Sequence, residues 1–301
     1  MGSSSPCLPL FSFFILLVKI VTASEFKICA YNAEGFDNAK ASDFRLLHTL
    51  NRIVSRCDIC LLQDVVDSGA IETLLESLNR YDSYGYQSVS SESLGNSPDD
   101  MQKYVFIYRE QNVNVTGQYQ YQNKSAFLRA PFAVQFQSEK TAIGSFVLVP
   151  LHSDALQAVQ EIDRLYDVFE EVTKRWNNKN VMFLGDFHAS CAYVTRADMG
   201  NIRLITNSSF TWLIGDKADS TISSDTNCAF DRIVVHGEPF LKTISPFSAE
   251  VFNYVRSFKL PKREALQVGN HLPVEVRLMS SALLLQATPL LILAQSFLSA
   301  L

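Results

Sequence analysis

Two short segments carry side chains that could bind a metal ion and move protons. Asp186 and His188 follow the apolar run Val-Met-Phe-Leu-Gly, two residues apart. Residues two apart on a strand point to the same face, so a carboxylate and an imidazole should emerge side by side where this strand leaves the core. Asn270 and His271 stand just before another predicted strand, Pro273–Leu278. Polar groups at strand ends in a mixed α/β chain indicate an active site.

Other predicted strands also end in residues that could take part in this chemistry. These are Asn32, Asp64, His152 and Asp231. Phosphodiester hydrolysis needs a cation to neutralise the phosphate, a base to activate water, an acid for the leaving oxygen, and donors for the pentacoordinate charge. Carboxylate and amide oxygens suit Mg²⁺, and histidine works as base or acid near neutral pH. A single strand-end Asp or His is usually a cap or a surface residue, but eight candidates in this order, in the context of the motifs considered next, are compatible with this chemistry.

Strands that alternate with helices must position these residues. The predicted strands, rich in Val, Ile, Phe or Tyr, are Phe26–Asn32, Asp58–Asp64, Tyr104–Arg109, Phe146–His152, Asn180–His188, Ala229–Val235 and Pro273–Leu278. Helical spacing of apolar residues predicts helices at Phe44–Arg56 and Leu156–Trp176. The alternation indicates a layered α/β domain.

The sequence resembles the deoxyribonuclease I family, part of the metal-dependent endonuclease/exonuclease/phosphatase group. The resemblance rests on Gly-Asp-Phe-His at 185–188 and Gly-Asn-His-Leu-Pro-Val at 269–274. The family usually has Gly-Asp-Phe-Asn and Ser-Asp-His-x-Pro-Val there. The likeness covers the chain from Phe26 to Leu278 and is greatest to the membrane-anchored deoxyribonuclease-1-like 1 branch. It implies a four-layer α-β-β-α sandwich and a metal-dependent DNA endonuclease.

The resemblance also implies roles for the matching residues. For catalysis they are His152, His271, Asp231, Gln102, Asp186 and Asn32. For phosphate binding the match is Arg129, and for the metal the matches are Asp64, Asp186, His188 and Asn270. The implied cofactor is a divalent cation, Mg²⁺ or Mn²⁺, with a structural Ca²⁺ as a further option. A nitrogen ligand from His188 would favour Mn²⁺ or Zn²⁺ at the site.

Four of these positions depart from the family pattern. They are Asp64 for Glu, Gln102 for the Glu that pairs with His152, His188 for Asn, and Asn270 for Asp. Loss of a nearby negative charge lowers a histidine pKa by roughly 1–3 units, which predicts a neutral His152 at pH 7. Asp100, two residues before Gln102, is an alternative source of that charge. Fewer acidic groups also predict weaker Mg²⁺ binding and reduced activity.

The surface expected to contact DNA is altered as well. Glu34 and Val66 stand where the family has basic residues, and Asp100 stands where it has a stacking Tyr. The chain has a net charge of −5, whereas proteins that bind DNA by bulk electrostatics are basic. Two alternatives therefore stay open: a catalytically weak or inactive, membrane-tethered member that binds nucleic acid or protein, and a phosphodiesterase acting on lipid or small-molecule phosphates.

Both ends of the chain carry processing signals. Residues 1–23 read as a secretory signal peptide, 24–279 as the catalytic domain, and 280–301 as an apolar tail. Small residues before the tail indicate a lipid-anchor signal, with a retained tail anchor as the alternative. Sequons at Asn114, Asn123 and Asn207 agree with lumenal passage. We therefore expect a monomer that enters the secretory pathway through the endoplasmic reticulum and reaches the cell surface or exterior.

The sequence has six cysteines, and Cys7 would leave with the signal peptide. Cys191 and Cys228 are plausible disulfide partners in a secreted chain, and the resemblance implies the same pairing. The other three, Cys29, Cys57 and Cys60, lie within apolar runs and are predicted to be buried core thiols. The C-x-x-C spacing of the last two leaves a redox or metal site as the alternative.

Overall fold

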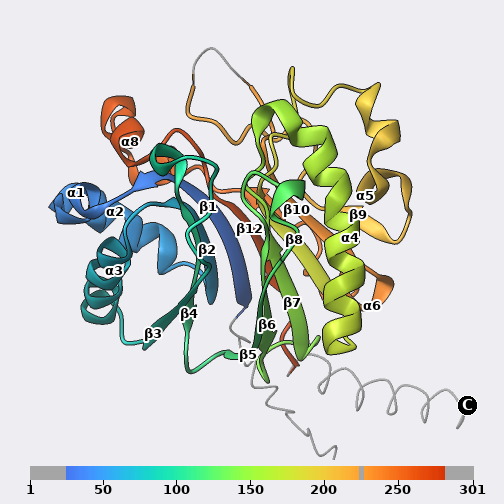
Figure 1. Ribbon diagram of the computed structural model, residues 1–301. Helices are drawn as coiled ribbons and strands as arrows, with labels where there is room; N and C mark the ends of the chain where they lie inside the picture. The colour runs from blue at the N-terminus through green and yellow to red at the C-terminus, as the bar shows by residue number, and fades with distance from the viewer. Residues whose placement is uncertain (1–24, 224–226, 282–301) are drawn as a thin grey trace, which may run out of the picture.

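The computed structural model describes residues 25–223 and 227–281. Two six-stranded sheets pack face to face, and helices cover the outer face of each sheet (Figure 1). The predicted four-layer α-β-β-α sandwich is confirmed. All seven predicted strands are present; the first ends at Phe36, four residues later than predicted, and the ends of the others shift by at most two residues.

The first sheet has the order β11-β12-β1-β2-β4-β3. Its strands are β1 (Phe26–Phe36), β2 (Ile59–Val65), β3 (Tyr86–Ser90), β4 (Lys103–Arg109), β11 (Glu250–Val251) and β12 (Val274–Leu278). Strands β1 and β2 are parallel, and the other neighbours are antiparallel. Central position explains why β1 is apolar on both faces: Ile28 and Ala30 enter the core between the sheets, and Cys29 and Tyr31 enter the core beneath the helices.

The second sheet has the order β5-β6-β7-β8-β10-β9. Its strands are β5 (Asn114–Gln120), β6 (Phe132–Gln137), β7 (Ser145–Pro150), β8 (Val181–Asp186), β9 (Phe210–Trp212) and β10 (Asp231–His236). Strands β7 and β8 are parallel, which the intervening helix makes possible. Strand β10 runs antiparallel to β8, so the first residue of β10 lies beside the last residue of β8.

Helices pack on the outside of both sheets. Those against the first sheet are α1 (Asn38–Ser42), α2 (Phe44–Val54), α3 (Ser68–Tyr81), α7 (Tyr254–Phe258) and α8 (Lys262–Val268). Those against the second sheet are α4 (Ala158–Trp176) and α5 (Arg203–Thr206), while α6 (Glu238–Leu241) contributes to the central core. Single 3₁₀ turns are η1 (Pro98–Asp100), η2 (Lys124–Ala126), η3 (Ala155–Gln157) and η4 (Asp198–Asn201).

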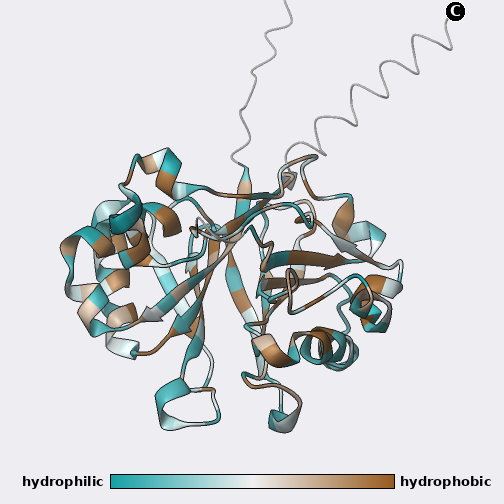
Figure 2. Cartoon of the chain, turned by 90° about the horizontal axis from the view of Figure 1, so that it is seen from above, coloured by the Kyte–Doolittle hydropathy of each residue, from teal (hydrophilic) through white to brown (hydrophobic). Residues whose placement is uncertain are grey.

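The two predicted helices form for local reasons. Helix α4 buries Ile162, Leu165, Phe169 and Val172 at three- and four-residue spacing, and it ends at Asn177 in the left-handed conformation. Helix α2 begins after Asp43, whose carboxylate accepts hydrogen bonds from two backbone N–H groups of the first turn. In Figure 2 the central strands carry brown, apolar segments, and the flanking helices alternate brown and teal as amphipathic helices do.

The cysteines confirm one prediction and correct another. Cys191 and Cys228 form the predicted disulfide. Cys29 and Cys57 are not free thiols, because the turn between α2 and β2 brings Cys57 to β1 and the two form a second disulfide with a Cα–Cα distance of 6.1 Å. Cys60 is a buried free thiol as predicted, and burial raises its pKa. The C-x-x-C pair therefore forms neither a redox couple nor a metal site.

The described residues contain no helix that is both long enough and apolar enough to cross a membrane. The predicted signal peptide at 1–23, Cys7 within it, and residues 282–301 of the predicted tail lie outside the described residues. Of the three sequon asparagines, Asn114 and Asn123 are exposed and Asn207 is half-buried.

Candidate active site

Most of the predicted residues converge where strands of both sheets end, at the top of the sandwich in Figure 1. Asn32 comes from β1 of the first sheet. Asp186 ends β8 and Asp231 begins β10, and the two are register partners in the second sheet. A hydrogen bond of 3.1 Å from Asn32 Nδ2 to Asp186 Oδ2 joins the two sheets. The site therefore lies at the seam of the sandwich, and neither sheet alone could form it.

Asp186 is the centre of the arrangement, and its carboxylate is fully buried. Its Oδ2 lies 3.5 Å from His271 Nε2 and 3.8 Å from His152 Nε2. Its Oδ1 accepts a hydrogen bond of 3.1 Å from the backbone N of His188. Burial alone would raise the pKa of Asp186, but the three surrounding histidines outweigh it and hold that pKa well below its usual range.

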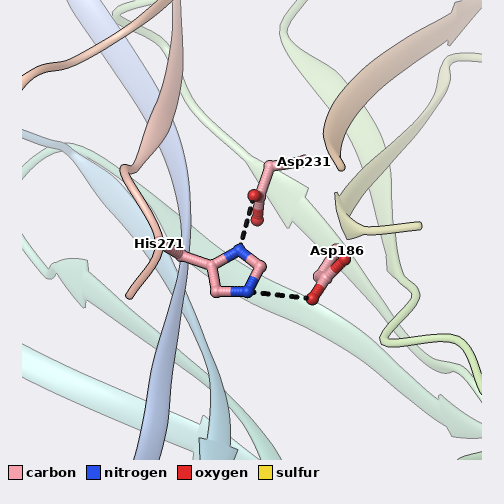
Figure 3. Close-up of side chains that lie close together, drawn as sticks. All are labelled: Asp186, Asp231 and His271. Carbon is pink, nitrogen blue, oxygen red and sulfur yellow. Dashed lines mark hydrogen bonds and ion pairs between the residues drawn. The ribbon is translucent and has the colours of Figure 1, made fainter. Parts of the chain in front are cut away.

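His271 lies between two buried carboxylates, as Figure 3 shows. Its Nδ1 is 2.8 Å from Asp231 Oδ2, and its Nε2 faces Asp186. Burial acts to lower the pKa of His271, but the charges of Asp231 and Asp186 together raise it to about 10. His271 is therefore an imidazolium at neutral pH, held in orientation by Asp231.

His152 has the opposite environment. Its Nδ1 is 2.7 Å from Gln102 Oε1, so a neutral amide stands where His271 has a carboxylate. Burial lowers the pKa of His152 to about 3, and the nearby charge of Arg129 acts in the same direction. The prediction of a neutral His152 is confirmed in direction, although burial is the larger cause. With Nδ1–H donated to Gln102, Nε2 is the basic nitrogen.

Asp100 does not supply the missing charge to His152. It lies in η1, outside β4, because the chain turns back on itself before that strand begins. Its Oδ1 lies 2.5 Å from a terminal nitrogen of Arg129. The alternative in which Asp100 compensates for Gln102 is therefore wrong, and the buried Arg129 predicted to bind phosphate is already paired with a carboxylate.

The prediction that Asp186 and His188 share one strand face is wrong in detail. Strand β8 ends at Asp186, and His188 has a left-handed φ of 48°. The turn still returns its ring to the site: Nδ1 lies 3.4 Å from Asp186 Oδ1 and 3.2 Å from Ser153 Oγ. The ring also stacks at 6.0 Å on His152.

The other predicted metal ligands lie toward the first sheet. Asp64 has a left-handed φ of 57° at an irregularity in the β2–β4 register. Burial raises the pKa of Asp64, although Arg129 and Lys40 act to lower it. Asn270 is exposed, and its backbone N donates to Glu34 Oε2 at 2.7 Å. The loop that carries His271 is thus tied to the end of β1.

Asp186, Asp231 and His271 form a group of possible ligands whose donor atoms lie within 4.8 Å of one another. Only Asp186 belongs to the predicted metal set. We interpret His271 with Asp231 as a hydrogen-bonded acid–base unit, because the 2.8 Å bond already uses His271 Nδ1. Asp64, which does belong to the predicted metal set, carries carboxylate oxygens whose charge burial disfavours. Such uncompensated oxygens fit a hard divalent cation.

Sequence reasoning missed several residues that hold this site together. Gln63 is fully buried; its Nε2 donates to the Leu151 carbonyl at 2.7 Å, and its Oε1 accepts from Asp186 N at 2.9 Å. Its sequence signal is a polar residue, Gln63, within the apolar strand that precedes Asp64. Ser220 Oγ accepts from Asp231 N at 3.1 Å, and nothing in its surrounding sequence marks it.

Comparison with known proteins agrees with the geometry. Residues 29–252 match the model of the "Endonuclease/Exonuclease/phosphatase family". Human deoxyribonuclease gamma is 40% identical over 276 residues, with 89% of this chain and 90% of the relative covered. Human deoxyribonuclease-1-like 1 is 41% identical over 268 residues, with 88% of each covered.

A solved structure of an endonuclease/exonuclease/phosphatase family protein from Bacteroides thetaiotaomicron has the same fold. Its TM-score is 0.60 at 14% identity, with 85% of this chain and 97% of the other covered. The family model and the two human relatives place the chain in the endonuclease/exonuclease/phosphatase family and, within it, in the deoxyribonuclease I family.

Proposed function

We propose that the protein is a divalent-metal-dependent endonuclease that hydrolyses DNA phosphodiester bonds. The relatives named deoxyribonuclease support the substrate. One geometric observation carries the mechanism: two imidazoles, His152 and His271, present Nε2 to the same buried oxygen of Asp186, at 3.8 and 3.5 Å. Each ring is fixed through Nδ1 by its own partner, so both reactive nitrogens face one space.

The partners at Nδ1 give the two histidines different roles. Gln102 is neutral and favours a neutral His152, whose Nε2 can take a proton from the attacking water. Asp231 is acidic and favours a charged His271, whose Nε2–H can donate a proton to the leaving oxygen. Environments that separate the protonation states of two similar groups are how one site performs acid and base steps together.

A divalent cation would be held by Asp64 and Asp186, and when bound it would neutralise charge on the phosphate. We propose Mg²⁺ or Mn²⁺, because these donors are carboxylate oxygens. Arg129 would contact a non-bridging phosphate oxygen, as its place in the family motif implies. Asn32 would hold Asp186 in position through its 3.1 Å hydrogen bond.

We further propose that turnover is reduced by the residues that depart from the family motif. With Gln102 rather than a carboxylate beside it, His152 is a weak base, and general base catalysis is most effective when the pKa lies near the working pH. Asn270 is exposed and offers no charge to a cation.

A plasmid-nicking assay with Mg²⁺, Mn²⁺ and Zn²⁺ in turn tests the proposal. We expect the purified domain to nick supercoiled DNA with Mg²⁺ or Mn²⁺, and the His152→Ala/His271→Ala double variant to lose that activity. Nicking no faster than this control with every metal would contradict the nuclease proposal and favour a non-catalytic binding protein.

The cellular location is likewise a proposal: passage through the secretory pathway and attachment to the cell surface. The two disulfides support it, because disulfides persist in oxidising compartments. Exposed sequons at Asn114 and Asn123 support it too. We expect glycosidase treatment to increase electrophoretic mobility and phosphatidylinositol-specific phospholipase to release the protein from cells. Protein that stays on the cells after this treatment would favour the retained tail anchor.

A further inference from the structure

Arg129 places a buried guanidinium beside the candidate catalytic residues. Only 9% of its side chain is exposed. Its backbone carbonyl accepts a hydrogen bond of 3.0 Å from the Tyr104 hydroxyl, and the same hydroxyl accepts one of 2.9 Å from the backbone N of His152. One phenol therefore fixes the Arg129 segment relative to the histidine. Arg129 Nε is buried without a partner, so the guanidinium keeps unused donor capacity.

The carboxylate of Asp100 occupies one end of this guanidinium. Asp100 Oδ1 lies 2.5 Å from an Arg129 terminal nitrogen, and 31% of the Asp100 side chain is exposed. Carboxylates and phosphates both present paired anionic oxygens that fit the arginine fork. Asp100 thus holds a donor that an incoming phosphate would use, on the side that solvent reaches.

A closed loop holds Asp100 in this position. Leu94 and Gln102 exchange two backbone hydrogen bonds, of 2.8 and 2.9 Å, which close the loop at its base. Gly95 has a φ of +153°, and a Cβ there would lie 2.4 Å from the Asp100 carbonyl oxygen, so only glycine permits this packing. The same loop carries Gln102, which bonds His152. One loop therefore contacts both a catalytic histidine and the phosphate-binding arginine.

We propose that Asp100 is a specificity-determining residue that competes with substrate phosphate for Arg129 and so weakens binding of polyanionic substrates. The inference rests on the proposed function in taking Arg129 as a phosphate ligand. A phosphate must displace Asp100 or share the remaining N–H groups of Arg129. Because this cost is the same in the bound substrate and in the transition state, Asp100 raises KM and leaves kcat unchanged.

Binding to a short fluorescein-labelled DNA duplex, followed by anisotropy in EDTA at fixed ionic strength, tests this without cleavage. The variant is Asp100→Asn, and the matched control is Asp99→Asn, which removes the same charge from an exposed neighbour in the same turn. We expect Asp100→Asn to lower Kd about tenfold, or about 1.4 kcal/mol, and the control to lower it less than about twofold. Equal effects of the two variants would overturn the inference.

A double-mutant cycle separates the contact from general charge. In an Arg129→Ala background, Asp100→Asn should lower Kd no more than the Asp99→Asn control does, and tightening beyond that control would contradict direct competition. The outcome is also separable from the nuclease proposal. If the protein nicks no DNA but the Asp100→Asn variant binds DNA more tightly than the Asp99→Asn variant does, the competition is supported and the nuclease proposal is not. Nicking activity with identical binding by the two variants supports the nuclease alone.

Discussion

At the scale of single residues, the site is defined by what each histidine has at Nδ1. His271 has the carboxylate of Asp231 at 2.8 Å, and His152 has the amide of Gln102 at 2.7 Å. The two contacts have nearly equal lengths, so geometry does not distinguish the histidines. The charge of the partner distinguishes them. Burial increases the difference between their pKa values, because a low-polarity environment penalises the charged ring that lacks a counter-ion.

Restoring charge at two positions should therefore raise activity. We expect the Gln102→Glu/Asn270→Asp variant to nick DNA about 10²-fold faster. His152 becomes a stronger base, and the cation site gains a carboxylate, and both changes act on the rate. Steady-state kinetics with Mg²⁺ measure it, and the single variants show which change matters. A rate equal to the wild type would place the loss elsewhere, for example at Glu34 and Val66.

The charged His271 should make stability depend on pH. Its folded pKa of about 10 lies above the unfolded value of 6.5, so its contribution is complete below pH 6.5 and is lost as pH rises toward 10. We expect the unfolding free energy of the wild type minus that of His271→Gln to fall across this window, by at most about 1.4 kcal/mol per pH unit. Urea titrations in EDTA measure it; a difference that does not change with pH would contradict the charged pair.

At the scale of elements, strand ends position the chemistry, and one glycine makes their approach possible. Gly185, next to Asp186 in β8, has a φ of +124°, and a Cβ there would lie 2.4 Å from Gln63 Nε2 and 2.6 Å from the Leu151 carbonyl. Gln63 comes from β2 of the other sheet. The two sheets therefore meet closely at Gly185, and the Gln63 amide bridges them.

Gly185→Ala should disturb both stability and the site. The alanine would have to adopt a disfavoured positive φ, and its Cβ would clash with the buried, hydrogen-bonded amide of Gln63. We therefore expect a loss of more than about 2 kcal/mol in unfolding free energy and a sharp fall in the nicking rate. The control is Gly200→Ala, where a Cβ meets nothing within 4 Å. Chemical denaturation of both variants measures their unfolding free energies. Equal values would show that the structure accommodates a Cβ at residue 185 without loss of stability.

At the scale of the whole molecule, three apolar layers form the core, one between the sheets and one beneath each set of helices. The disulfide from Cys29 to Cys57 fixes β1 to the turn that follows α2, across 28 residues of sequence. Since β1 carries Asn32, this link stabilises the strand that brings the first sheet to the active site.

Removing this disulfide should destabilise the fold. We expect Cys29→Ser/Cys57→Ser to lose about 2–4 kcal/mol of unfolding free energy, because the unfolded chain gains the freedom of the opened loop. Cys60→Ala is the comparison, since it alters the same apolar layer and keeps the disulfide. Urea denaturation under non-reducing conditions measures both. A loss no greater than that of Cys60→Ala would mean that packing, rather than the crosslink, holds β1.

The sequence predicted most of the elements with strong patterns and missed most of those without them. Runs of apolar β-formers identified seven strands, and three- and four-residue spacing identified α2 and α4. Helix α3 buries Ala70, Ile71, Leu74 and Leu78 at the same spacing, although it is not among the predicted helices. Strands β5 and β9 are half-exposed, so their alternation is weak. Short elements depend on neighbours that are distant in sequence, and local patterns do not report those neighbours.

By itself, the sequence determined which groups are available: the histidines, carboxylates and amides at strand ends, and the family to which their order belongs. Only the tertiary structure decided how they are paired. Gln63 meets Asp186, Asp100 meets Arg129, and Cys29 meets Cys57, all across distances that no local pattern spans. The reason is physical: strand periodicity fixes the direction of a side chain, whereas its protonation and its availability to a substrate depend on burial and on partners that packing brings from elsewhere in the chain.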